Sequence, residues 1–244
     1  MIGRGSTAQQ RQAAIDLYDQ YYTEPGQLRD SDAFYRWVLK KLAPTPGCSL
    51  LDVACGEGHL LRFAAARGLI AWGVDLSSRA VALARRIVGQ DIIAIADGES
   101  LPFPSRSFDY VTCLGSLEHF VSPEQGLVEM RRVLKPYGLA ALLLPNSYYL
   151  FDIIWHVWRQ GYPVSHRQKI ERFATVGEWR DFIQAHGFRV ICTYKYNLCL
   201  PRSLEDLRWY ARSPKKIISA LLSPLTPFNL SYSFLFICKR YGPT

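Results

Sequence analysis

Short, continuously apolar runs alternate with amphipathic stretches through the first 145 residues of the chain. The runs are CSLLDVA, LIAWGVD, DIIAIAD, FDYVTCL and GLAALLL, and helical patterns begin between them near Gly58, Ser77 and Pro123. Continuous apolar runs of this length are typical of strands that crossover helices bury on both faces. The alternation therefore predicts an α/β fold with a parallel sheet.

Both ends of the chain depart from this alternation. Apolar and aromatic residues recur at helical spacing over 8–22 and 29–42, before Pro44 and Pro46. An apolar and aromatic helix is expected over 147–158, followed by a polar basic stretch. We divide the chain into an N-terminal helical cap at 1–44, a core at 45–146, an aromatic and basic cap insertion at 147–174, and closing elements at 175–244.

The closing elements carry recognisable boundary signals. Thr175 with Glu178 three residues on is a capping-box spacing, and Gly187 ends the helix that begins there. FRVICTYKY and SYSFLFICKR are the predicted last two strands. Between them a helical insertion at about 198–230 is expected to hold two short helices, near 203–211 and 214–222.

Composition narrows the class of protein. The chain has 244 residues, of which 49% are hydrophobic and 20% charged, which excludes a disordered chain and suits one large domain with a cap. No run of 18 uncharged apolar residues is present, and the first ten residues lack the apolar region of a secretory signal. A cytoplasmic location is therefore expected.

The positive charge is confined to one part of the chain. Residues 1–145 hold 15 Lys and Arg against 15 Asp and Glu, whereas residues 146–244 hold 14 against 6 and also 19 of the 32 aromatic residues. This suggests a shared scaffold followed by a specialised surface for an anionic or amphipathic partner. A solvated basic face explains the same counts.

The carboxyl ends of the predicted strands carry the candidate chemistry, because ligands of open α/β sheets bind there. The first strand leads into a turn of small residues in which a ligand can approach the backbone: Asp52, Ala54, Cys55, Gly56 and Gly58. The turn is not the G-x-G-x-x-G of dinucleotide sites, since Leu61 stands at the third glycine position. The Walker pattern of nucleotide triphosphate sites is also absent.

The next three strand ends point to a nucleoside. Asp75, followed by Leu76, comes 17 residues after Gly58, near the spacing at which an acid binds ribose hydroxyls. Asp97 and the Gly98 amide offer an acceptor and a donor that suit adenine. Backbone carbonyls around Leu114 and Gly115 are placed to hold an ammonium group. Each aspartate alone is also explained as a turn or cap residue, but the four ends together occur in the correct order.

These segments resemble the class I S-adenosylmethionine-dependent methyltransferases, in particular the small-molecule branch related to quinone biosynthesis. The matching sequences are LLDVACGEG, GVDLS, ADGESLPFPSRSFDYVTCLGSLEHF and EMRRVLKPYGLAALLLPN, and the resemblance is close over about 45–146. One departure is Ala54, where the family usually has the first glycine of its G-x-G-x-G turn. Because alanine is also small, we expect the cofactor still to bind.

The resemblance implies a fold, a cofactor and roles for the residues above. The fold is a Rossmann-like, doubly wound sheet of seven mostly parallel strands, with the last strand antiparallel beside the fifth. The cofactor is S-adenosylmethionine, which becomes S-adenosylhomocysteine. Asp52 and the Ala54–Gly58 turn would face the methionine part, Asp75 the ribose, Asp97 and Gly98 the adenine, and the Leu114 carbonyl the amino group.

Catalysis and acceptor binding are less sharply indicated. His119, at the end of the fourth strand, is the candidate base for an acceptor that must lose a proton, although such a histidine often only orders the pocket. Candidate substrate-binding residues are Tyr22 from the N-terminal helix and Tyr148, Trp155 and His156 from the aromatic segment. His166 is more readily explained as a surface or structural residue, and scattered histidines and unpaired cysteines predict no metal site.

The sequence predicts methyl transfer to a small-molecule or lipid-like acceptor, with peripheral contact to an anionic membrane surface through the basic residues. An RNA methyltransferase is the alternative that the basic, aromatic second part allows. It is disfavoured because LGSLEH replaces the [DNS]-P-P-[YFW] motif of amino-group methyltransferases acting on bases. A protein that binds a nucleoside without chemistry is the third possibility.

Overall fold

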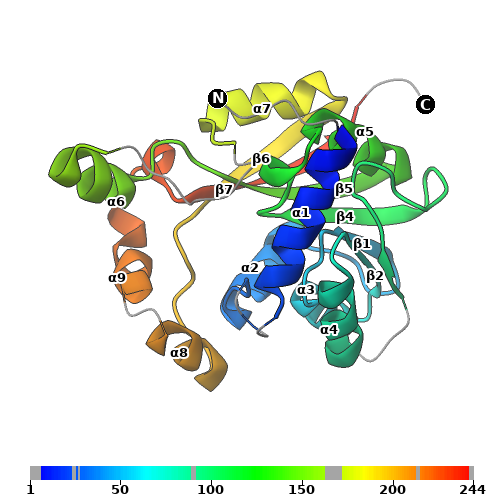
Figure 1. Ribbon diagram of the computed structural model, residues 1–244, viewed down its shortest axis with the longest axis horizontal. Helices are drawn as coiled ribbons and strands as arrows, with labels where there is room; N and C mark the ends of the chain where they lie inside the picture. The colour runs from blue at the N-terminus through cyan, green and yellow to red at the C-terminus, as the bar shows by residue number, and fades with distance from the viewer. Residues whose placement is uncertain are drawn as a thin grey trace.

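A computed structural model describes residues 7–23, 26, 28–88, 92–162, 172–212 and 215–241. Its centre is a seven-stranded sheet in the order β3-β2-β1-β4-β5-β7-β6 (Figure 1). The strands are β1 Ser49–Val53, β2 Ile70–Asp75, β3 Ile93–Ile95, β4 Phe108–Leu114, β5 Leu134–Pro145, β6 Phe188–Tyr196 and β7 Ser233–Arg240.

Strand directions follow the predicted topology. The first five strands pair in parallel with their neighbours. β7 lies between β5 and β6 and is antiparallel to both. The predicted doubly wound sheet, with its last strand antiparallel beside the fifth, is confirmed. The order reverses between β1 and β4, which opens a crevice at the carboxyl ends of these strands.

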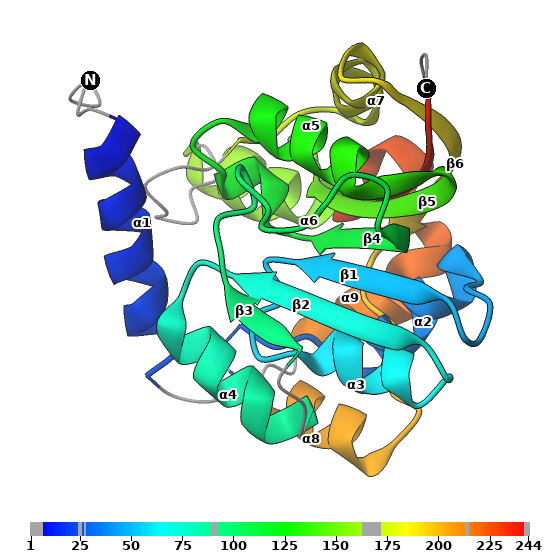
Figure 2. The same ribbon diagram turned by 90° about the vertical axis from the view of Figure 1, so that its right-hand side faces the viewer.

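Helices cover both faces of the sheet, which explains why its central strands are mostly apolar. One face carries α2 Asp32–Leu42, α3 His59–Ala65 and α4 Ser78–Val88, and the other carries α5 Pro123–Val133 and α7 Val176–Ala185 (Figure 2). Within β1, Leu50 packs with the first group, whereas Leu51 and Val53 pack with the second. All three are fully buried. Successive side chains of a strand point to opposite faces, so both must be apolar here.

The first helix, α1 Thr7–Tyr21, stands beside the carboxyl ends of the strands (Figure 2). Ser77, just after β2, donates a hydrogen bond to Asp19 of this helix, and Arg79 donates to the Asp19 carbonyl at 3.1 Å. The second predicted helix begins at Asp32 rather than near 29, because the Ser31 side chain caps it by accepting from the Phe34 amide at 3.3 Å.

The aromatic segment after β5 is helical, as predicted, but several of its large apolar side chains are exposed. It consists of α6 Leu150–Asp152, continued by the π-helical turn η2 Ile153–Trp158. Trp155 is 45% exposed and Trp158 is 81% exposed. These two indole side chains therefore lie at the surface of the described structure. Part of the cap insertion expected at 147–174, including His166, Arg167 and Lys169, lies outside the described residues.

The closing elements follow the predicted order. The helical insertion contains α8 Leu204–Ala211, α9 Lys215–Leu222 and the short turns η3 Ser223–Leu225 and η4 Phe228–Leu230. The Thr175–Glu178 capping box is present, with the Thr175 side chain accepting from the Glu178 amide and Glu178 accepting from the Thr175 amide. Within the described ranges, no helix combines the length and apolar character needed to cross a bilayer.

Replacing Thr175 by alanine should lower the free energy of unfolding by about 1 kcal/mol, because an amide at the start of α7 loses its acceptor. Urea unfolding of the purified protein measures the change. Ser105→Ala, at an exposed loop position, is the matched control and should stay within about 0.5 kcal/mol of the parent. Equal effects of the two substitutions would show that the capping box contributes nothing.

Candidate active site

The loops after β1, β2, β3 and β4 enclose two adjoining cavities. The larger cavity, of about 380 Å³, is lined by the glycine turn and by Asp52, Leu114 and Gly115. The smaller cavity, of about 80 Å³, is lined by Asp75, Leu76, Asp97 and Gly98. Five residues line both cavities: Tyr18, Tyr22, Ala54, Ser116 and His119. The structure thus brings the predicted strand-end residues together at one site.

The turn after β1 depends on left-handed backbone conformations. Ala54, Gly56 and Gly58 have φ angles of 57°, 52° and 75°. Glycine adopts such angles freely, whereas alanine does so at a cost of roughly 1 kcal/mol. A side chain at Gly56 is excluded, since a Cβ there would lie 2.8 Å from the Tyr22 hydroxyl oxygen. The family departure at Ala54 therefore keeps the turn geometry but strains it.

Asp52 lies at the floor of the larger cavity, near the end of β1. It is 4% exposed and accepts a hydrogen bond of 2.6 Å from the Thr112 hydroxyl on β4. Burial raises the pKa of Asp52 to about 7, against the opposing effect of the Thr112 hydrogen bond. A cation placed beside this carboxyl group would favour its ionised form.

Asp75 ties the end of β2 to the glycine turn. Its two carboxylate oxygens accept from the Gly56 amide at 2.8 Å and from the Ser77 amide at 2.9 Å. The cap of α4 is Ser77, whose hydroxyl accepts from the Ala80 amide at 3.2 Å. Burial raises the pKa of Asp75 to about 6, even though these amide hydrogen bonds oppose the shift.

Phe120 lines the smaller cavity together with Gly98. A Cβ at Gly98 would lie 2.5 Å from the Phe120 ring, so only glycine fits. Asp97 accepts from the Glu99 amide at 2.8 Å, as a turn residue does. It also pairs with Arg11 of α1, whose guanidinium lies 2.9 Å from both Asp97 and Glu99. The sequence gives no signal that could have identified Arg11, because only the fold brings α1 to this loop.

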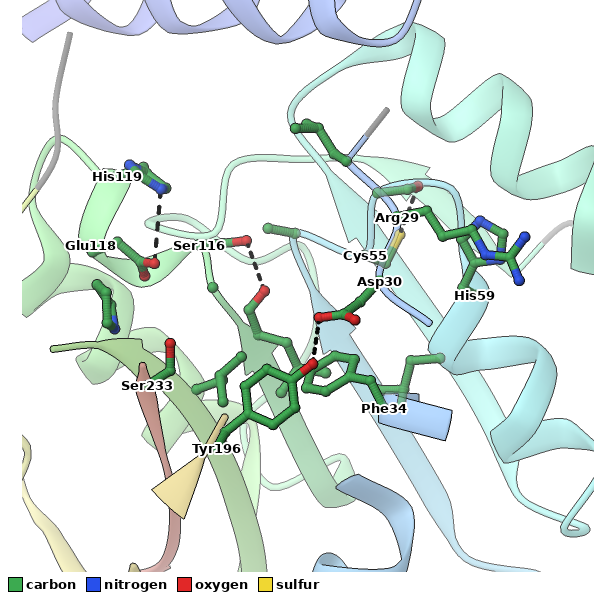
Figure 3. A pocket seen from close by; sticks show the side chains of 18 of the residues that line it. Arg29, Asp30, Phe34, Cys55, His59, Ser116, Glu118, His119, Tyr196 and Ser233 are labelled. Carbon is green, nitrogen blue, oxygen red and sulfur yellow. Dashed lines mark hydrogen bonds and ion pairs between the residues drawn. The ribbon is translucent and has the colours of Figure 1, made fainter. Parts of the chain in front are cut away.

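Two residues of the loop after β4, Ser116 and His119, line both cavities. Figure 3 shows both side chains at the larger cavity. Leu114 and Gly115 line the larger cavity, with Gly115 at a φ of 66°. His119 ends the short turn η1 Leu117–His119, and its Nε2 lies 3.8 Å from the Glu118 carboxylate. The predicted base candidate thus stands at the junction between the cavities.

The structure places the predicted substrate-binding residues in two different regions. Tyr22 lines both cavities, and burial raises the pKa of its hydroxyl well above the usual value. Tyr148, Trp155 and His156 are not among the described residues that line either cavity. They lie on or beside α6 and η2, where Tyr148 is 56% exposed. Their role in substrate binding stays a prediction.

Several polar residues of the larger cavity were not identified from the sequence. Asp30, before α2, accepts a hydrogen bond of 2.8 Å from the hydroxyl of Tyr196 at the end of β6. Glu57 and His59 pair at 3.1 Å beside the glycine turn. In the sequence, the only indication that Glu57 and His59 belong to the site is their position at the turn. Asp30 and Tyr196 are 166 residues apart, and no local pattern links them.

The described residues contain no group of three or more His, Cys, Asp or Glu side chains that could hold a metal ion.

Comparison with known proteins agrees with this geometry. A family model described as "Methyltransferase domain" matches residues 51–142. The ubiquinone/menaquinone biosynthesis C-methyltransferase UbiE of Geotalea daltonii is 33% identical over 134 residues, which are 50% of this chain and 57% of the relative. The UbiE of Burkholderia vietnamiensis is 33% identical over 53% of this chain and 54% of the relative. The chain thus spans about half the length of the curated relatives it matches.

Solved structures share the fold over nearly the whole chain. A 1,6-didemethyltoxoflavin-N1-methyltransferase of Burkholderia thailandensis, solved with S-adenosylhomocysteine, has a TM-score of 0.67 at 14% identity and covers 98% of this chain and 92% of its own. The [4+2]-cyclase SpnF also has a TM-score of 0.67, at 20% identity over 96% of this chain and 97% of its own. At these identities the likeness establishes the fold only. The predicted class I methyltransferase fold is confirmed.

The buried carboxyl groups predict how stability depends on pH. In the folded chain the pKa of Asp52 is about 7 and that of Asp75 is about 6, whereas both are about 4 in an unfolded chain. Between about pH 4 and pH 7 the folded state therefore binds more protons than the unfolded state. Their contribution to stability is therefore full at low pH and is lost as the pH rises. We expect the free energy of unfolding to fall by roughly 4 kcal/mol between about pH 5 and pH 8.

Urea unfolding across this pH range measures the fall, and Asp52→Asn separates it from the titration of other groups. The variant should lose clearly less stability over the range, because asparagine does not titrate. A slope equal to that of the parent protein would contradict the shifted pKa of Asp52.

Proposed function

We propose that the protein, whose residues 51–142 match the methyltransferase domain family, transfers a methyl group from S-adenosylmethionine to a small-molecule acceptor. The observation that carries this proposal is the pair of cavities that meet at Tyr22, Ala54, Ser116 and His119. In this assignment the smaller cavity takes the adenosine, and the larger cavity takes both the methionine part and the acceptor. The reacting methyl group then lies where the cavities join.

The residues present fit this cofactor. Asp52 and the backbone of the Ala54–Gly58 turn face the methionine part, and the Leu114 carbonyl accepts from its ammonium group. Asp75 binds the ribose, while Asp97 and Gly98 bind the adenine. S-adenosylmethionine carries an ammonium and a sulfonium charge, which would stabilise the ionised forms of the buried carboxyl groups. This electrostatic match supports the assignment of the larger cavity.

The catalytic contribution of the protein is chiefly positioning. S-adenosylmethionine supplies an electrophilic methyl group, and a displacement at that carbon requires the acceptor atom to approach in line with the breaking bond. Tyr18 of α1 and Tyr22, which follows this helix, line both cavities. Their rings would keep water away from the reacting methyl group. His119, at the same junction, is the proposed base for an acceptor that loses a proton.

A nucleic-acid acceptor fits this arrangement less well. The larger cavity is lined by the carboxyl groups of Asp30, Asp52, Glu57, Glu118 and Asp152, which repel phosphates. The basic residues of the second part of the chain lie mainly outside this cavity. A small acceptor that enters the cavity is therefore favoured over an RNA strand.

Calorimetric titration tests the cofactor directly. S-adenosylmethionine and S-adenosylhomocysteine should bind, whereas NAD should not. Asp75→Ala should weaken S-adenosylhomocysteine at least about tenfold, because it removes a charge-assisted hydrogen bond to the ligand and loosens the glycine turn.

Asp109→Ala is the matched control for this titration. Asp109 lies at the amino end of β4, where Lys135 pairs with it at 2.8 Å, so its loss affects stability but not cofactor affinity. Circular dichroism of each variant verifies the fold. Folded protein that ignores both adenosyl compounds at millimolar concentration would overturn the proposal.

We further propose that the acceptor is lipid-like and that the protein meets it at the cytoplasmic surface of an anionic membrane. The turn η2 with helices α8 and α9 lies along one side of the molecule (Figure 1). Large apolar side chains on this side are exposed: Ile154, Trp155, Val157, Trp158, Leu204, Leu207, Ile218, Leu221 and Leu225. We call this set the apolar side.

Cationic side chains accompany the apolar side. Arg159 stacks over Trp155 at 4.8 Å, and Lys216 over Trp209 at 4.2 Å. Arg202, Arg208 and Arg212 are also exposed on or beside α8. Apolar and aromatic groups flanked by Lys and Arg match the interface of an anionic bilayer.

Flotation with vesicles that contain phosphatidylserine tests this contact. The protein should float with anionic vesicles at low salt, and Trp158→Ser should reduce the bound fraction several-fold because an exposed aromatic anchor is lost. Tyr137→Ser, which removes an aromatic residue that is 87% exposed on β5, is the control and should not change binding. Failure of the parent protein to float would remove the membrane contact and leave the methyltransferase proposal intact.

A further inference from the structure

The larger cavity has a wall that the proposed cofactor assignment does not use. This wall combines aromatic rings with the carboxyl groups of Asp30, Glu118 and Asp152. Arg29 is the one Lys or Arg among the described residues that line the cavity, and it pairs with Asp32. The space left for an acceptor is therefore electronegative, although the chain as a whole carries a net charge of +8.

Asp30 is the most firmly held carboxylate of this wall. One oxygen accepts from the Tyr196 hydroxyl at 2.8 Å and the other from the Ser31 amide at 2.7 Å, while the Asp30 amide donates to the Tyr35 hydroxyl at 3.2 Å. Tyr196 is 2% exposed and packs against Phe34 with 4.9 Å between ring centroids. Figure 3 shows Asp30 and Tyr196 facing each other within the cavity.

These contacts leave Asp30 able to bind one more donor. Each carboxylate oxygen has two acceptor positions, and the protein contacts above occupy one on each. Because its neighbours fix the side chain, an incoming donor need not order it. Burial raises the pKa of Asp30, whereas the hydrogen bonds from Tyr196 and Ser31 oppose this shift and favour the charged form.

We propose that Asp30 binds a protonated amino group of the acceptor, and that the acceptor is a cationic amine with an apolar or aromatic body. This inference rests on the proposed function and specifies its substrate class. The ammonium group pairs with Asp30, while the rings of Phe34, Tyr35 and Tyr232 surround the rest of the molecule and attract its charge. Tyr196 acts as a positioning residue for the carboxylate.

The same charges reject an anionic acceptor. S-adenosylmethionine adds one ammonium, one sulfonium and one carboxylate group, so its single net positive charge does not balance the acidic wall. A carboxylate or phosphate on the acceptor would enter beside Asp30, Glu118 and Asp152, with Arg29 already paired. Like charges at close range in a partly buried site are strongly unfavourable.

Matched probes test the proposal without knowledge of the natural acceptor. 2-Phenylethylamine and 3-phenylpropanoate share an apolar body and differ in the sign of their charge. Each is titrated by calorimetry into the protein, with and without saturating S-adenosylhomocysteine. We expect the amine to bind at least about tenfold more tightly than the carboxylate. Asp30→Asn should remove most of this preference, and Asp152→Asn, on the surface helix α6, should reduce it several-fold.

Asp181→Asn, at an exposed position of α7, is the matched control and should leave the preference unchanged. The affinity for S-adenosylhomocysteine and the thermal unfolding midpoint of each variant report on the fold and on the cofactor site. Equal binding of the two probes, binding of neither at millimolar concentration, or an unchanged preference in folded Asp30→Asn would overturn the assignment. Absence of S-adenosylhomocysteine binding alone would instead overturn the proposed function, since the amine titration without it still reports on Asp30.

Discussion

The hydrogen bonds from the Gly56 and Ser77 amides to Asp75 join the turn after β1 to the end of β2. The Gly56 amide reaches Asp75 only because Ala54, Gly56 and Gly58 adopt left-handed conformations. The same conformations bring the turn against Tyr22, the residue that follows α1. Both cavities are therefore shaped by one short segment of backbone. The carboxyl group of Asp75, which these two amides hold, is buried and has a raised pKa. Its position suits a cationic ligand.

Charge is divided between the interior and the surface of this molecule. Acidic side chains line the larger cavity, whereas exposed Arg and Lys side chains flank the apolar side on η2, α8 and α9. The excess of basic residues in the second part of the chain thus describes an outer surface. It gives no guide to the ligand, because a buried carboxylate interacts more strongly with a bound group than a distant, solvated arginine does. Surface and cavity would then recognise different chemical groups.

The first helix contributes side chains beside both cavities. Arg11 pairs with Asp97 and Glu99 beside the smaller cavity, and Tyr18 and Tyr22 wall the junction with the larger cavity. The fold shared with SpnF and with the toxoflavin methyltransferase does not by itself fix the reaction, so the acceptor wall carries the specific information.

The sequence by itself determined the mostly parallel sheet and the gathering of the small-residue turn and the strand-end acids at one edge of it. Its resemblance to a known family placed the last strand antiparallel beside the fifth. Apolar runs, the small-residue turn and acids such as Asp75 and Asp97 are local patterns, and the α/β rhythm constrains where they meet. Only the tertiary structure decided the acceptor wall. Asp30 and Tyr196 come from a loop and a strand end 166 residues apart, and Arg11 meets Asp97 through packing of α1. It also decided that Trp155 and Trp158 face outward, because helical periodicity cannot show which side of an all-apolar helix is covered.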